Sequence, residues 1–124
     1  MTAWTSDELT QIGLAVEFQV ASRRSDSSLR PYVMIWGVRH AAHIYVRSAH
    51  GWNNPWFQRA LQSGDGRIRA GGVERDIAFE QPDPDVGEDV HAAYHAKYDG
   101  YGTGIVGTVV SPEAARSTLR LVPR

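Results

Sequence analysis

Apolar and polar residues alternate along several stretches of this chain, and the alternation predicts β-strands that bury one face. The clearest alternations lie at residues 15–22 and 44–48. Residues 32–38 form an almost continuous apolar run of strand-forming residue types, which predicts a central strand paired with residues 44–48 as a hairpin. Within this hairpin, Tyr45 and Arg47 fall on the same predicted face.

Strand signals continue in the second half of the chain. Residues 66–70 and 73–80 flank the Gly71–Gly72 pair, and two glycines supply the positive backbone angles of a two-residue turn. These segments therefore predict a second hairpin. Residues 105–110 and 117–122 are apolar and predict two further strands.

Short helices are predicted between the strands by their capping residues. Thr5 stands three residues before Glu8, the spacing of a capping box, and predicts a helix over residues 6–13. Asn54 followed by Pro55 predicts the N-cap and first residue of another helix. The remaining helical predictions cover residues 86–99 and 111–115. Because the strands are mostly joined as hairpins, closure into a small barrel is favoured over a doubly wound α/β sheet.

The composition indicates one folded domain over residues 1–124, since 42% of the residues are hydrophobic and 22% are charged. No apolar run approaches the roughly 20 residues of a membrane helix, and the first residues lack the pattern of a signal peptide. We expect a cytoplasmic protein without a membrane partner. The chain contains no cysteine, which excludes disulfides, thiolate nucleophiles and cysteine-ligated metal sites.

Charge is distributed unevenly along the chain. Residues 23–75 contain nine arginines and three acidic residues, whereas residues 76–113 contain eight acidic residues and one lysine. Arginine binds phosphate and carboxylate groups through paired hydrogen bonds, so an anionic ligand of the middle third is one interpretation. A solvated charged surface is the other. The pI of about 6.5 argues against a nucleic-acid partner.

Residues 47–61 combine the features of an anion-binding pocket. A helix N-terminus presents unpaired N–H groups and a partial positive charge, and Arg47 would end the adjoining strand. In the alternative interpretation, Asn54 only caps the helix, Trp52 and Trp56 fill the core, and Arg47 pairs with a surface acid.

Arg75 is predicted to share the inward face of its strand with Val73, Ile77 and Phe79. A buried arginine needs a compensating partner, because an isolated interior charge costs several kcal/mol. We expect an acidic side chain as this partner, with a ligand phosphate as the alternative.

Two histidines and the absence of two motifs bear on other kinds of chemistry. His91 and His95 lie one helical turn apart, a spacing that metal sites use, but no third ligand with clear spacing accompanies them. Surface placement is the favoured interpretation, and no metal is expected. The chain also lacks a Gly-x-Ser-x-Gly motif and a Walker-type loop, which argues against a serine hydrolase and a nucleoside triphosphatase.

Four segments carry a resemblance to known families: SRRSDSSLRPYVMIW, IYVRSAHGWNNPWFQRA, GRIRAGGVERDI and SPEAARSTLRLVPR. By these segments the chain is identified as a member of an uncharacterised bacterial family, domain of unknown function 2255. The order of strands, basic loop and Trp-bearing helix is distantly similar to flavin- and deazaflavin-binding split barrels, especially the deazaflavin-dependent nitroreductases. The pattern predicts an α+β fold of six to seven mostly antiparallel strands with two or three short helices, and the resemblance implies that they form a small split β-barrel.

The resemblance also implies a cofactor site. In the nitroreductases, the basic loop and the segment before the helix hold the phosphate and side chain of the cofactor. The matching positions here are Arg23, Arg24, Ser25, Arg30, Arg47, Ser48, Asn53, Asn54 and Trp56, and Arg75 is added as a candidate phosphate ligand. Tyr98 and Tyr101 resemble a tyrosine pair that faces substrate, where a phenol can donate a proton, although packing is the favoured interpretation of both.

These features together lead us to expect an oxidoreductase that uses FMN or a deazaflavin coenzyme on a small organic substrate. The expected partners are this cofactor and substrate, and tryptophans near residues 36, 52 and 56 could line a homodimer contact. The basic loop departs from the Gly-Arg-Lys-Ser-Gly of the nitroreductases, because SRRSDSS lacks both glycines and carries Asp26. This departure supports two alternatives, a ligand-binding protein without redox chemistry and a cofactor-free enzyme that uses the same barrel pocket.

Overall fold

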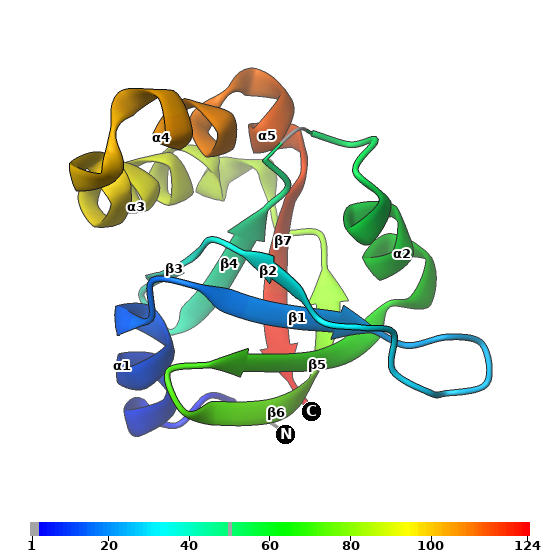
Figure 1. Cartoon of the computed structure of the whole chain (residues 1–124). Coiled ribbons are helices and arrows are strands. Elements are labelled where there is room, and N and C mark those ends of the chain that lie inside the picture. Colours follow the sequence, from blue (N-terminus) through cyan, green and yellow to red (C-terminus); the bar gives the residue numbers. More distant parts are fainter. Residues whose placement is uncertain (1–2, 50) are drawn as a thin grey trace.

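The two edges of the central sheet are joined by a single residue. A computed structural model describes residues 3–49 and 51–124, and in this part of the chain seven strands form one antiparallel sheet in the order β2-β1-β5-β6-β7-β4-β3. The edge strands β2 (Val33–Ile35) and β3 (Gly37–His40) are separated only by Trp36. Because the chain passes directly from one edge to the other, the sheet curls into a nearly closed barrel (Figure 1). The predicted α+β split barrel is confirmed.

The other elements surround this closure. The remaining strands are β1 (Phe18–Ser22), β4 (His43–Arg47), β5 (Asp65–Ala70), β6 (Val73–Glu80) and β7 (Thr118–Pro123). The α-helices are α1 (Ser6–Leu14), α2 (Pro55–Ser63), α3 (Gly87–Tyr98), α4 (Thr103–Val110) and α5 (Pro112–Arg116). Two short 3-10 turns, η1 (Pro84–Val86) and η2 (Asp99–Tyr101), flank α3.

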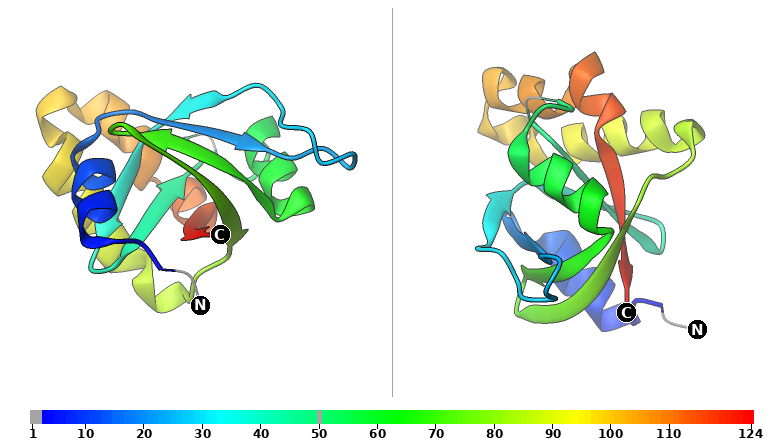
Figure 2. Two further views of the ribbon diagram at one scale, coloured as in Figure 1. Left: turned by 90° about the horizontal axis from the view of Figure 1, so that it is seen from below. Right: turned by 90° about the vertical axis from the view of Figure 1, so that its right-hand side faces the viewer.

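Two apolar clusters hold the fold together. The first cluster fills the barrel and includes the buried residues of α1 and α2. These two helices therefore pack their apolar faces against the barrel core. The second lies outside the barrel, where α3 and α4 pack on β3 and β4 through Val38, Tyr45, Tyr94 and Val106. Figure 2 shows α3, α4 and α5 gathered on this one side of the sheet. The buried apolar surface of these two clusters is the main favourable contribution to folding.

Several local predictions are confirmed because short-range interactions decide them. Thr5 and Glu8 form both hydrogen bonds of the capping box of α1. The β5–β6 hairpin turns at Gly71 and Gly72, whose φ angles are +57° and +84°. Pro55 is the first residue of α2, although the Asn54 side chain makes no capping hydrogen bond.

The prediction of a strand at residues 105–110 is wrong, since this segment lies in α4. Its β-branched residues favour a strand, but Val106 and Val109 lie on one helical face and are buried against α3. Burial of this face outweighs the modest β-propensity of valine. This segment brings the α-helices of the described residues to five, against the two or three expected.

The prediction of one central strand at residues 32–38 is also wrong, because the segment divides into the two edge strands β2 and β3. Gly37 marks the division. A methyl group added there would collide with the Phe18 ring, so only glycine lets the chain pass this close to β1. The Gly37 backbone is then held by the Tyr98 hydroxyl, which accepts from Gly37 N at 3.2 Å.

Candidate functional site

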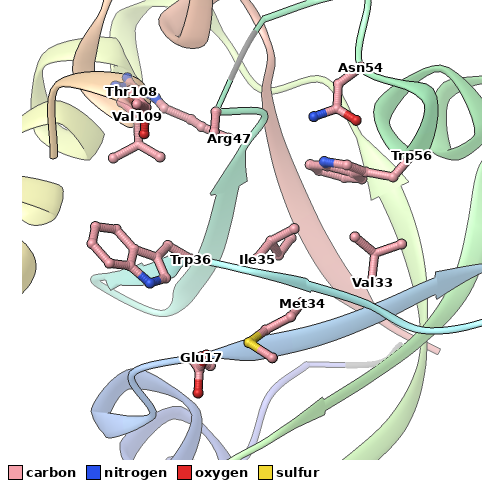
Figure 3. A pocket seen from close by; sticks show the side chains of 11 residues that line it. Glu17, Val33, Met34, Ile35, Trp36, Arg47, Asn54, Trp56, Thr108 and Val109 are labelled. Atoms are coloured by element: carbon pink, nitrogen blue, oxygen red, sulfur yellow. Dashed lines mark hydrogen bonds between the residues drawn. The ribbon is translucent and has the colours of Figure 1, made fainter. Parts of the chain in front are cut away.

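A cavity of about 330 Å³ opens where the β2 edge faces the end of β4. It lies between the segment 33–36, the N-terminal turn of α2 and the last turn of α4 (Figure 3). Its lining residues are Glu17, Val33, Met34, Ile35, Trp36, Arg47, Ala49, Asn54, Trp56, Thr108 and Val109. The cavity therefore occupies the break in the barrel, where β2 has no strand neighbour on its outer side.

Two tryptophans form opposite sides of this cavity (Figure 3). Trp36 is half-buried, and its ring stacks on Tyr98 with a centroid distance of 4.0 Å and an interplanar angle of 5°. Trp56 is almost fully buried and packs edge-on against Phe57. Because neighbouring rings already hold both tryptophans in place, their side chains lose little conformational entropy when a ligand binds. The cavity walls therefore suit a flat aromatic ligand.

Arg47 places a buried positive charge at the cavity wall. Its side chain is 1% exposed, and its guanidinium donates to Thr118 Oγ1 at 2.9 Å, Gly87 O at 3.0 Å and Val109 O at 3.2 Å. Within residues 3–49 and 51–124 it forms no ion pair, so neutral oxygens fix its position and leave its charge uncompensated. Burial lowers the pKa of Arg47 from its usual value.

A smaller cavity adjoins the first along Val33 and Trp56, which line both. It is lined by Arg30 and Arg59 as well, and neither arginine pairs with a carboxylate in the described part of the chain. Glu17 lies at the other end of β2, beside Trp36. The smaller cavity has a volume of only about 20 Å³. The main cavity thus has an acidic residue at one end, and two arginines without a carboxylate partner among the described residues lie beyond its other end.

Arg59 is a site residue that the sequence did not predict. It lies three residues after Trp56 on α2, and residues with this spacing share a helix face. That spacing is a signal that could have identified it. Trp36 and Val109 were missed for a different reason, because both lie in segments whose secondary structure was predicted incorrectly.

The basic loop does not bring its first two arginines to the cavity. Arg23 donates to Asp76 Oδ1 at 2.9 Å, and Arg24 donates to Leu29 O at 2.9 Å. Figure 1 shows the loop projecting away from the barrel. Ser25 is exposed on it, and Asp26 accepts hydrogen bonds from the backbone and hydroxyl of Ser28. Only Arg30 of this predicted group lines a cavity that touches the site.

Arg75 has the acidic partner that was expected. Its Nη1 lies 2.7 Å from Glu8 Oε1, and its guanidinium lies 5.7 Å from the Trp4 ring centroid. This ion pair fastens α1 to β6, and Arg75 lines neither cavity of the candidate site.

Ser48, Asn53 and Asn54 differ in their relation to the site. Asn54 lines the main cavity, whereas Asn53 is exposed. Ser48 is fully buried beside Ser117, and its hydroxyl has no hydrogen-bond partner within the described residues. This hydroxyl is not part of either cavity lining.

The two tyrosines support Trp36 from behind. The Tyr98 hydroxyl lies 2.7 Å from Val16 O and 2.9 Å from Gly37 O, and burial raises the pKa of Tyr98. Its proton is therefore held on backbone acceptors, as the packing interpretation predicted. Tyr101 is half-exposed, with its ring centroid 5.8 Å from that of Trp36. In the described residues neither tyrosine lines the cavity, and both position a side chain that does.

The chain belongs to the DUF2255 family, described as uncharacterized proteins conserved in bacteria, whose family model matches residues 8–121. No curated protein sequence matches the chain at a significant level.

Solved structures share the fold at low sequence identity. The conserved hypothetical protein Rv2991 from Mycobacterium tuberculosis has a TM-score of 0.70 and 12% identity, with 99% of this chain and 82% of that chain covered. A FAD-binding protein from Mesorhizobium loti has a TM-score of 0.60 and 13% identity, with 98% and 91% covered. An F420 reductase has a TM-score of 0.59 and 13% identity, with 93% and 90% covered. Likeness at this identity shows a common fold.

No helix in the described residues is long and apolar enough to span a membrane.

Proposed function

We propose that this protein binds a flavin-type cofactor, either a flavin or a deazaflavin, in the cavity beside β2 and acts as an oxidoreductase on a small organic substrate. The observation that carries this proposal is the pair of tryptophan walls with the uncompensated charge of Arg47 between them. The names of two structures of the same fold, a FAD-binding protein and an F420 reductase, favour this class of ligand.

The residues at the cavity fit such a group in shape and charge. A volume of about 330 Å³ falls within the range of about 300–1,000 Å³ that small-molecule sites occupy. Flavin cofactors join a flat ring system to an anionic tail. The ring system matches the space between Trp36 and Trp56. The tail would leave the main cavity toward Arg30 and Arg59, because Glu17 disfavours an anion at the other end.

The bound cofactor would supply the hydride chemistry, and the chain's residues would bind and orient it. Trp36 and Trp56 would flank the ring system and shield it from water. Arg47 contributes a fixed positive charge in a setting with little competing water, which favours negative charge on a neighbouring group. Arg30 and Arg59 would hold the anionic tail.

A second candidate is a ligand-binding protein without redox chemistry. The contacts of Arg23 and Arg24 favour it, since both arginines of the basic loop are already bound to groups of this chain. This candidate uses the same cavity for a different flat anion.

Titration of purified protein with FMN, FAD and F420, followed by tryptophan fluorescence, tests the proposal. We expect micromolar binding of at least one cofactor, and a loss of affinity of about tenfold or more in Trp36→Ala because a cavity wall is removed. Trp52→Ala is the matched control, since Trp52 is 44% exposed and lines neither cavity. Absence of binding by all three cofactors would exclude the redox proposal and favour the second candidate.

The orientation of the cofactor has its own test. Arg59→Ala should weaken FMN binding about tenfold and leave riboflavin, which lacks the phosphate, unaffected. Arg116→Ala is the control, because Arg116 is likewise exposed but lines a separate cavity. Equal weakening of FMN and riboflavin would place the phosphate away from Arg59.

A further inference from the structure

Two histidines lie side by side on α3, outside both apolar clusters. The ring centroids of His91 and His95 are 4.7 Å apart, with an interplanar angle of 59°. His91 is exposed and His95 is partly exposed, whereas Val90, Tyr94 and Tyr98 form the buried face of the same helix. The histidine pair involves none of the residues that line the candidate cofactor cavity.

The separation of the two rings is that of imidazoles sharing one metal ion. Metal–nitrogen bonds of about 2.0–2.1 Å, at a nitrogen–metal–nitrogen angle between about 90° and 110°, place the two ring centroids about 4.5–5.2 Å apart. The observed 4.7 Å lies within this interval. The spacing of the two rings on the helix is therefore compatible with one shared ion.

Asp99 orients one of these imidazoles. The Nδ1 atom of His95 lies 2.7 Å from Asp99 Oδ1, one turn further along the chain. A carboxylate accepts hydrogen bonds, so Nδ1 carries the hydrogen of this bond. Nε2 is then the nitrogen that remains to face a metal. A carboxylate behind a ligating histidine is the usual arrangement in metal sites, where it fixes the ring and raises its basicity.

The charges around the pair include attractive and repulsive groups. Glu88 lies one turn before His91 and acts on it electrostatically, and Asp99 adds a second carboxylate. Arg47 acts on His91 with the opposite sign from the inner side of the helix, where it donates to Gly87 O. Partial desolvation, His95 and Arg47 lower the pKa of His91, and Glu88 acts in the opposite direction.

The sequence alone favoured surface placement of these histidines without a metal, but the contact between their rings and the position of Asp99 lead to a different inference. We propose that His91 and His95 form a two-histidine site for a late first-row divalent cation such as Zn²⁺, Ni²⁺ or Cu²⁺, with Asp99 as the positioning residue. Imidazole nitrogen is a preferred ligand of these ions. The described residues contain no group of three or more histidine and acidic side chains at metal-binding distance, so water completes the coordination.

The test uses protein without a histidine tag, titrated with Zn²⁺ alone in competition with a chromogenic chelator. We expect one ion per chain, and a loss of affinity of about tenfold or more in His95→Ala and in Asp99→Asn. His43→Ala is the matched control, because His43 is an exposed histidine on the β3–β4 hairpin. Unchanged affinity in His95→Ala, or an equal loss in His43→Ala, would overturn the proposal.

A second measurement does not depend on any variant. Nitrogen NMR of the wild-type imidazoles should show that Zn²⁺ shifts the Nε2 resonance of His95 and one nitrogen of His91 and leaves the His43 resonances in place. Shifts distributed over all histidines, or none at saturating Zn²⁺, would likewise overturn it.

Discussion

Cationic side chains are stabilised in two different ways on two regions of this protein. On the β5–β6 hairpin, Arg67 donates to Asp76 at 2.9 Å and Arg69 pairs with Glu74. Arg23, which follows β1, also donates to Asp76 at 2.9 Å. Each of these arginines has a carboxylate partner and remains partly exposed. We call these pairs of arginines with Asp76 and Glu74 the ionic ladder. It is exposed to solvent, and its opposite charges largely cancel.

On the side of α3 and the cavity, the cations are held by neutral oxygens. Arg47 donates to two backbone carbonyls and to Thr118, and Lys97 donates to Gly37 O at 2.7 Å above the Phe18 ring. Neither has a carboxylate partner within the residues that the structure describes. Such contacts fix the position of a cation without cancelling its charge.

The largest difference between the two regions should appear when an arginine is removed. Arg47→Ala should lower the free energy of unfolding by about 3 kcal/mol, because hydrogen bonds from a charged group are lost and two buried carbonyls lose a donor. Arg69→Ala, in the ionic ladder, should change it far less, because the Arg69 side chain is 51% exposed and its pair with Glu74 is solvated. Urea unfolding of both variants measures this, and equal effects would contradict the distinction.

The second comparison concerns pH. Burial lowers the pKa of Lys97 from 10.5 to about 8, so between these values the unfolded chain binds more protons than the folded protein. The contribution of Lys97 should therefore stabilise the fold progressively as pH rises from about 8 to 10.5. Lys97→Met should remove this dependence, which unfolding curves of both proteins across the window would reveal. Parallel pH profiles would show that Lys97 titrates as an exposed lysine.

The smallest effect is expected in the ionic ladder. Asp76→Asn should lower the free energy of unfolding by no more than about 1 kcal/mol, because its arginine partners are partly exposed and can turn to water. Hydrogen bonds from the arginines lower the pKa of Asp76, so this contribution is present above its unfolded pKa and is lost as pH falls through the folded value. Added salt should reduce the difference between the variant and the wild type, and a loss as large as that of Arg47→Ala would contradict this ranking.

The sequence predicted correctly the elements that local interactions control. Thr5 with Glu8 and the Gly71–Gly72 turn each act within a few residues, so their pattern is sufficient to predict α1 and the β5–β6 hairpin. At the site, Arg47, Asn54 and Trp56 were predicted and do line the cavity. The resemblance also located Arg30 at its edge.

Long-range packing decided the remaining elements. Residues 105–110 form a helix because α3 offers an apolar face for Val106 and Val109, and no local pattern contains that information. Trp36 reached the cavity because the chain crosses there from one sheet edge to the other.

The sequence by itself determined a small antiparallel α+β domain, its capped helices and the arginine-rich middle third, because capping, turn geometry and alternation act over a few residues. Only the tertiary structure decided which arginines remain available for a ligand. A guanidinium is neutralised or left uncompensated according to the groups that folding brings beside it, and those groups can be distant in the sequence, as Thr118 is 71 residues from Arg47.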